Sequence, residues 1–192
     1  MKRLILVAFL VLFTVIVAFS NEDKRLQDNY FSVSTGCGAT IPLGDLSPAF
    51  NIAVTPVAAF DYNLTFKWGV LGFGIFTGCT IQKTSDEAAY QSLFLSIPAA
   101  LHLKYATNFN SPLYGYGEAS GGIAVNIFRY QEEYPGVSDD TVIKPFFSPG
   151  IGVGYSIMPW LSVSAFGNFL MIFFDDTVYM GISPGVKGEI NF

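Results

Sequence analysis

Charged residues are scarce in this sequence: they form 13% of its 192 residues, about half of the ~25% share that is typical of soluble domains. The net charge is −5 and no basic residues cluster, so a nucleic acid is not an expected partner. Long apolar runs are also missing after residue 20, although 51% of the chain is hydrophobic. A membrane-spanning helix needs about 20 consecutive apolar residues. The apolar side chains must therefore fill a large core or be distributed over many short strands.

The first twenty residues differ from the rest. Lys2 and Arg3 precede an almost continuous apolar stretch over 4–17, and small residues flank Phe19 at positions 18 and 20. This pattern predicts a secretory signal peptide over residues 1–20, cleaved before Asn21, followed by a polar lead over 21–29. An uncleaved anchor helix is the alternative for the same features.

Only two cysteines are present, Cys37 and Cys79. The strand pattern described next places them in the first and third strands, so a whole strand lies between them. Two strand spacings of ~4.8 Å exceed the ~7 Å Cα separation that a disulfide allows. We therefore interpret both cysteines as small apolar side chains.

Apolar and polar residues alternate with a period of two along most of the chain, which is the signature of β-strands. Eight such runs can be distinguished, and the barrel domain that they predict covers residues 30–192. The runs occupy residues 30–41, 52–62, 67–82, 92–105, 113–128, 143–157, 161–173 and 178–192.

The connections alternate in length as well. Long polar connections follow the first, third and fifth runs, whereas tight turns are expected at 63–65, 107–112 and 158–160. The last hairpin, at 174–177, is short. Short turns at one end and longer loops at the other predict an all-β fold, an eight-strand antiparallel up-and-down transmembrane β-barrel.

Each run has one large apolar face and one face of glycine, serine, asparagine and scattered charges. Eight strands enclose a space just wide enough for side chains, which small polar residues fit, so the apolar face should point outward to lipid. Aromatic residues agree with two membrane rims: Tyr62, Tyr105, Tyr155, Trp160 and Phe192 toward the short turns, and Tyr90, Tyr130, Tyr134 and Tyr179 toward the loops. A soluble, lipocalin-like barrel is the competing interpretation.

The segments "LFLSIPAALHLKY" (93–105) and "SPLYGYGEASGGI" (111–123) resemble the small bacterial outer-membrane β-barrel domain superfamily, whose members include OmpA, OmpX and OmpW. Ile190 and the terminal Phe192 resemble the C-terminal signal that the barrel-assembly machinery reads, although Lys187 stands where a glycine is usual. The resemblance implies the cell outer membrane as location, with its lipid and that machinery as partners.

Six titratable residues should face the interior in its short-turn half: Asp61, His102, Lys104, Glu118, Lys187 and Glu189. Unpaired buried charges are costly, so we expect a network, with Lys104–Glu118 as a pair across one hairpin. We interpret it as a structural plug, and a path for protons or ions is the alternative.

His102 is the only histidine. Small outer-membrane lipases and acyltransferases resemble this class and use a histidine beside a serine or acidic residue. Since spacing identifies no such partner here, we predict no catalytic residue, no metal and no cofactor.

Six apolar residues should line the interior toward the loops: Phe76, Phe94, Phe128, Phe146, Phe166 and Leu170. They could form a vestibule for a small hydrophobic ligand, as is proposed for OmpW relatives, or simply pack the barrel mouth. The acidic 129–141 loop is a solvated surface that could also contact a host or another cell.

The sequence thus predicts a non-enzymatic outer-membrane protein with a structural or surface-interaction role. Binding or passage of a small hydrophobic molecule is the alternative, and a lipid-modifying enzyme is a third.

Overall fold

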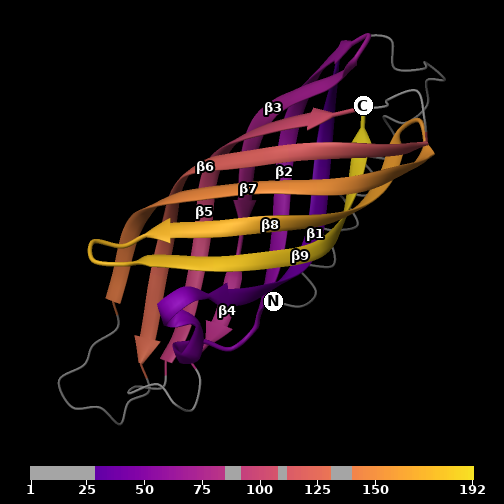
Figure 1. Ribbon diagram of the computed structural model, residues 1–192. Helices are drawn as coiled ribbons and strands as arrows, with labels where there is room; N and C mark the ends of the chain where they lie inside the picture. Colours follow the sequence, from indigo (N-terminus) through magenta and orange to yellow (C-terminus); the bar gives the residue numbers. More distant parts are fainter. Residues whose placement is uncertain (1–28, 85–91, 108–111, 131–139) are drawn as a thin grey trace, which may run out of the picture.

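The computed structural model describes residues 29–84, 92–107, 112–130 and 140–192. The predicted signal peptide, most of the polar lead, Tyr90 and Tyr134 lie outside these residues. Nine strands form one antiparallel sheet (Figure 1). They are β1 (Tyr30–Leu43), β2 (Ala53–Phe66), β3 (Gly69–Gly78), β4 (Thr80–Lys83), β5 (Ser92–Ala106), β6 (Leu113–Tyr130), β7 (Asp140–Met158), β8 (Leu161–Phe173) and β9 (Val178–Asn191).

The sheet closes on itself. Except for β3 and β4, each strand pairs with its neighbours in sequence, and β1 pairs with both β2 and β9. β3 and β4 are two parts of one strand, because both pair with β2 and β5 and only Cys79 separates them. The ring therefore has eight positions, and the predicted eight-strand up-and-down barrel is confirmed. In Figure 1 the strands β6 to β9 run obliquely across β1 to β3 on the opposite wall.

The chain ends within the wall of the barrel. The backbone N–H of Phe31 donates to the carbonyl of Phe192 at 3.0 Å, and the N–H of Phe192 donates back to Phe31 at 2.9 Å. These two hydrogen bonds leave no unpaired edge at the junction of the first and last strands.

One tight turn lies further along the chain than predicted. We expected the turn between the second and third runs at residues 63–65, but β2 continues to Phe66 and the two turn residues are Lys67 and Trp68. Asn63 belongs to the inward face: it is fully buried and donates to the Ser32 hydroxyl at 2.9 Å. A polar residue that looked like a turn signal is thus part of the lumen.

Side chains alternate between the two faces of the wall, as the sequence predicts. The exposed fraction is 75% for Leu101, 74% for Ile151 and 66% for Val186, all on the outer face. The buried polar residues point into the lumen instead. Cys37 lies exposed on β1, and both cysteines are free.

At the loop end the connection after β1 folds back over the barrel. It contains a 3-10 helix, η1 (Gly44–Ala49), and then Phe50, whose ring packs on Phe94 and Tyr179 at centroid distances of 5.6 and 5.8 Å. Tyr179 was expected as an outward rim aromatic, and that prediction is wrong. Its side chain is 1% exposed and its hydroxyl donates to Gln82 Oε1 at 2.8 Å, because the β9 register turns it into the lumen.

Within the described ranges, none of the helical segments has the length and apolar character that crossing a membrane as a helix requires.

Candidate functional site

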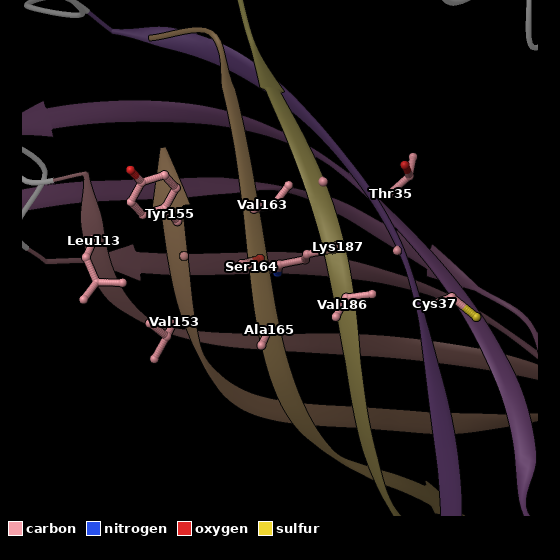
Figure 2. A pocket seen from close by; sticks show the side chains of 13 residues that line it. Thr35, Cys37, Leu113, Val153, Tyr155, Val163, Ser164, Ala165, Val186 and Lys187 are labelled. Atoms are coloured by element: carbon pink, nitrogen blue, oxygen red, sulfur yellow. The ribbon is translucent and has the colours of Figure 1, made fainter. Parts of the chain in front are cut away.

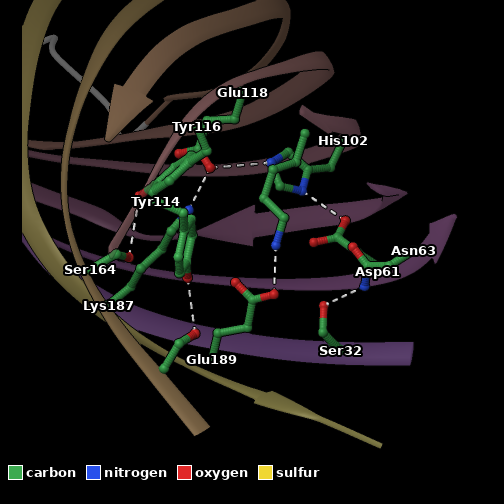
Figure 3. Close-up of polar contacts among 12 residues, drawn as sticks. Ser32, Asp61, Asn63, His102, Tyr114, Tyr116, Glu118, Ser164, Lys187 and Glu189 are labelled. Carbon is green, nitrogen blue, oxygen red and sulfur yellow. Dashed lines mark hydrogen bonds and ion pairs between the residues drawn. The ribbon is translucent and has the colours of Figure 1, made fainter. Parts of the chain in front are cut away.

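The short-turn half of the lumen contains a cluster of charged side chains (Figure 3). All six titratable residues that the sequence predicts there are buried, with exposed fractions of 9% or less: Asp61, His102, Lys104, Glu118, Lys187 and Glu189. Since charges cannot be buried cheaply without partners, their contacts decide what the cluster can do.

Two ion pairs cross the lumen. Lys104 Nζ on β5 donates to Glu189 Oε1 on β9 at 2.6 Å, and Lys187 Nζ on β9 donates to Glu118 Oε2 on β6. β5 and β9 occupy opposite positions of the eight-position ring. Each pair therefore connects walls that share no backbone hydrogen bond.

The expected Lys104–Glu118 pair is not formed, although the two residues are direct cross-strand neighbours. Lys104 reaches across the lumen to Glu189 instead, and the Glu118 carboxylate is engaged by Lys187 and His102. The Lys187 ammonium also lies 4.6 Å from the centroid of the Tyr116 ring, a cation–π contact.

His102 lies between two carboxylates. Its Nδ1 is 2.8 Å from Asp61 Oδ1 and its Nε2 is 3.5 Å from Glu118 Oε2. Only a doubly protonated imidazole can donate from both nitrogens. That form would balance the three carboxylates of the cluster against three cations.

Gly74 lies between the two residues of the Asp61–His102 contact. It lies on β3, between the strands of Asp61 and His102, and is the cross-strand neighbour of both residues. It occupies a position of the strand that faces the lumen. A Cβ at this position would collide with the backbone carbonyl of Phe60 and approach Asp61 Cα at 2.8 Å. The absence of a side chain is therefore what lets the backbones of β2 and β3 approach this closely between Asp61 and His102.

We expect Gly74→Ala to lower the free energy of unfolding by about 1–3 kcal/mol, because its Cβ meets backbone atoms that cannot rotate away. The measurement is denaturant unfolding of the refolded barrel in lipid vesicles. Gly167→Ala is the matched control, since a Cβ there meets no atom within 4 Å. Equal effects of the two substitutions would show that the close approach at Gly74 is unimportant.

Two tyrosines extend the network toward β8. The Tyr114 hydroxyl donates to Ser162 at 3.0 Å and the Tyr116 hydroxyl donates to Ser164 at 3.3 Å. Each ring crosses a glycine of β7, Gly154 or Gly152, whose Cβ would overlap the phenol. Neither tyrosine was predicted as a residue of the charged cluster. Both share the alternation of Glu118, and this alternation indicates that they face the lumen.

The six predicted vestibule residues do not form one group. Phe94, Phe146 and Leu170 are at most 8% exposed and belong to one apolar cluster toward the loops, against which Phe76 and Phe128 pack. Phe166 lies apart, in a second cluster with Tyr116 and Ala106. The first cluster is filled by its own side chains and by Phe50, Phe174 and Tyr179.

Two small cavities lie in the described part of the lumen. One cavity of about 10 Å³ lies among Ser34, His102, Glu118 and Lys187, and another of about 20 Å³ lies nearer the loops. Neither could hold more than about one water molecule.

A larger groove, of about 700 Å³, lies on the outer wall over β7, β8, β9 and β1 (Figure 2). Exposed side chains form it, including Cys37, Val153, Tyr155, Val163 and Val186. Its predominantly apolar lining contrasts with the charged interior on the other side of the same strands.

The structure offers no metal centre within the described ranges, where no three histidine, cysteine, aspartate or glutamate side chains are arranged to hold an ion. The contacts of His102 are the carboxylates named above, not a serine hydroxyl that it could activate. This arrangement supports ion pairing and not nucleophilic chemistry.

No protein-family model and no curated protein matches this chain. Solved structures do. Neisserial surface protein A (NspA) is similar with a TM-score of 0.59 at 17% identity, over 85% of this chain and 97% of that one. Ail of Yersinia pestis, in complex with the heparin analogue sucrose octasulfate, gives 0.59 at 14% identity, over 86% and 100%. The outer membrane protein OprG from Pseudomonas aeruginosa gives 0.53 at 11% identity, over 86% and 96%. Identities this low show a shared fold, that of the small outer-membrane β-barrels.

Proposed function

We propose that this chain is a non-enzymatic integral protein of a bacterial outer membrane, with a structural or surface-interaction role. The observation that carries the proposal is the distribution of its side chains. Large apolar residues cover the outside of the barrel, whereas six titratable residues are buried inside it. Water would favour the reverse arrangement, and a hydrocarbon environment favours this one.

The lipid of the membrane would cover the outer wall, and its acyl chains would fill the groove of Figure 2. Export by residues 1–20 and recognition of Ile190 and Phe192 by the barrel-assembly machinery complete this proposal. Phe192 is 49% exposed at the end of β9, which leaves its ring accessible to such a partner.

The charged cluster serves as a structural plug in this proposal. Its ion pairs connect opposite walls and its six residues leave a cavity of only about 10 Å³ among them. A hydrated ion could not pass without breaking at least one pair. This packing therefore does not support the alternative path for ions.

In planar-bilayer recordings, the refolded protein should show no stable open conductance, because side chains fill its lumen. A porin reconstituted by the same protocol is the positive control for insertion. A stable, reproducible conductance step would contradict the structural plug.

The runner-up role, binding or passage of a small hydrophobic molecule, requires the cluster around Phe94 and Phe146 to open. Both rings face the lumen, which that role needs, but Phe50 and Tyr179 pack against Phe94. Retention of a single alkyl chain in native mass spectrometry, lost in Phe146→Ala, would favour the runner-up over the plug.

A surface partner would meet the loops. The similar structure of Ail contains a heparin analogue, but the 129–141 segment of this chain has four acidic residues and one arginine. Like charges repel, so a sulfated polysaccharide does not suit this loop, and a basic protein surface does. Hydrolysis of lipid, the third hypothesis, has less support, because both ring nitrogens of His102 face carboxylates although Ser120 is its cross-strand neighbour.

A further inference from the structure

The second cavity of the lumen has both apolar and polar residues in its lining and lies outside the charged cluster. Its volume is about 20 Å³, and the lining polar residues are Thr40, Thr55, Thr80, Ser96, Ser148, Asn168 and Ser183. A buried water needs roughly 10–15 Å³ and two to four polar partners. The cavity meets both conditions.

Four of the hydroxyls form a chain across β4, β2, β1 and β9. Thr40 Oγ1 donates to Ser183 Oγ at 3.2 Å, and the Thr40 and Thr55 hydroxyl oxygens are 2.6 Å apart. Thr55 Oγ1 and Thr80 Oγ1 are 3.3 Å apart. A hydroxyl has one proton to donate. Because Thr40 donates to Ser183, Thr55 must donate to Thr40 and Thr80 to Thr55. The proton of Ser183 is then left for another acceptor.

Asn168 provides the complementary group. It is the direct cross-strand neighbour of Ser183, is 8% exposed, and lines the same cavity. Its Oδ1 is buried and has no hydrogen-bond partner among the described residues. An unsatisfied buried acceptor costs about 1–3 kcal/mol. The residues that carry the leftover donor and the orphaned acceptor thus line the same cavity, and no hydrogen bond joins their side chains.

We propose that one ordered water molecule occupies this cavity, accepting from Ser183 and donating to Asn168 Oδ1. Its second proton goes to a serine of the lining, Ser148 or Ser96. A cation is a poorer occupant because no carboxylate lines the cavity, so nothing would offset the desolvation of its charge. We assign no water to the 10 Å³ cavity, which is at the lower limit of size.

X-ray hydroxyl-radical footprinting of the refolded barrel in detergent tests the proposal, because radicals formed from a bound water label the side chains beside it. Phe146 lines the cavity and Phe94 does not, yet their exposed fractions are 3% and 1%. Phe146 should therefore be labelled several-fold faster than Phe94. Equal rates, whether low or high, would overturn the proposal, since the lumen would then be dry or generally wet.

Variants identify the partners of the water. Asn168→Leu should reduce the labelling of Phe146 to that of Phe94, and Ser183→Ala should do the same if the first variant fails to fold. Asn126→Leu is the matched control: Asn126 also has a buried, unpartnered Oδ1 but does not line the cavity. A change of labelling when sodium is exchanged for choline would assign the site to a cation and overturn the water.

Discussion

Replacing Lys104 with methionine is expected to lower the free energy of unfolding by about 3–5 kcal/mol, because it leaves the Glu189 carboxylate buried without its cation. The Lys104 and Glu189 side chains are 6% and 9% exposed, and their ion pair spans 2.6 Å. Methionine keeps much of the apolar stem, so lost packing contributes little. Guanidinium unfolding in lipid vesicles, followed by tryptophan fluorescence, measures the effect.

The chain contains a matched control for this substitution. Lys144 pairs with Asp175 at the same distance, 2.6 Å, but the Asp175 side chain is 86% exposed. Lys144→Met should cost under about 1 kcal/mol, as exposed ion pairs do. If Lys104→Met costs no more than Lys144→Met, water must reach the cluster and the plug is not dry.

A double variant distinguishes the stability of the pair from the cost of an orphaned charge. Lys104→Met combined with Glu189→Leu removes both charges and should recover most of the loss, because an apolar replacement of a buried pair is often neutral or stabilising. Recovery would show that the pair is not needed for stability in itself. The charges would then serve to set which walls of the barrel face each other.

The fold was largely predictable from the sequence because alternation with a period of two specifies both a strand and its two faces. Leu101 and His102 illustrate this: one points outward and the other into the lumen, as adjacent residues of a strand must. These properties depend on local sequence.

Contacts across the lumen were not predictable in the same way. The partner of Lys104 depends on the stagger between β5 and β9, which share no backbone hydrogen bond and whose relative height no local pattern encodes. The hydroxyl chain of Thr40, Thr55 and Thr80 was missed for the same reason. Each threonine occupies an inward position, but only the register of three strands brings their hydroxyls to one level.

Replacing Leu101 with arginine tests the environment of the outer wall, on which the proposed function depends. Leu101 lies five residues from Ala106, the short-turn end of β5, or roughly 13 Å from that rim for a strand tilted by about 40°. That is close to the middle of an apolar band ~25 Å tall, where arginine costs about 2–4 kcal/mol. We expect that loss in vesicle unfolding experiments, and only about 0–1 kcal/mol for Asp176→Arg in the exposed hairpin between β8 and β9.

In a soluble, lipocalin-like barrel, Leu101 with its 75% exposure would face water. Arginine would then change stability by no more than about 0.5 kcal/mol. The two environments therefore predict effects that differ several-fold for one surface substitution, so a tolerated arginine at this position would remove the basis for placing the barrel in a membrane.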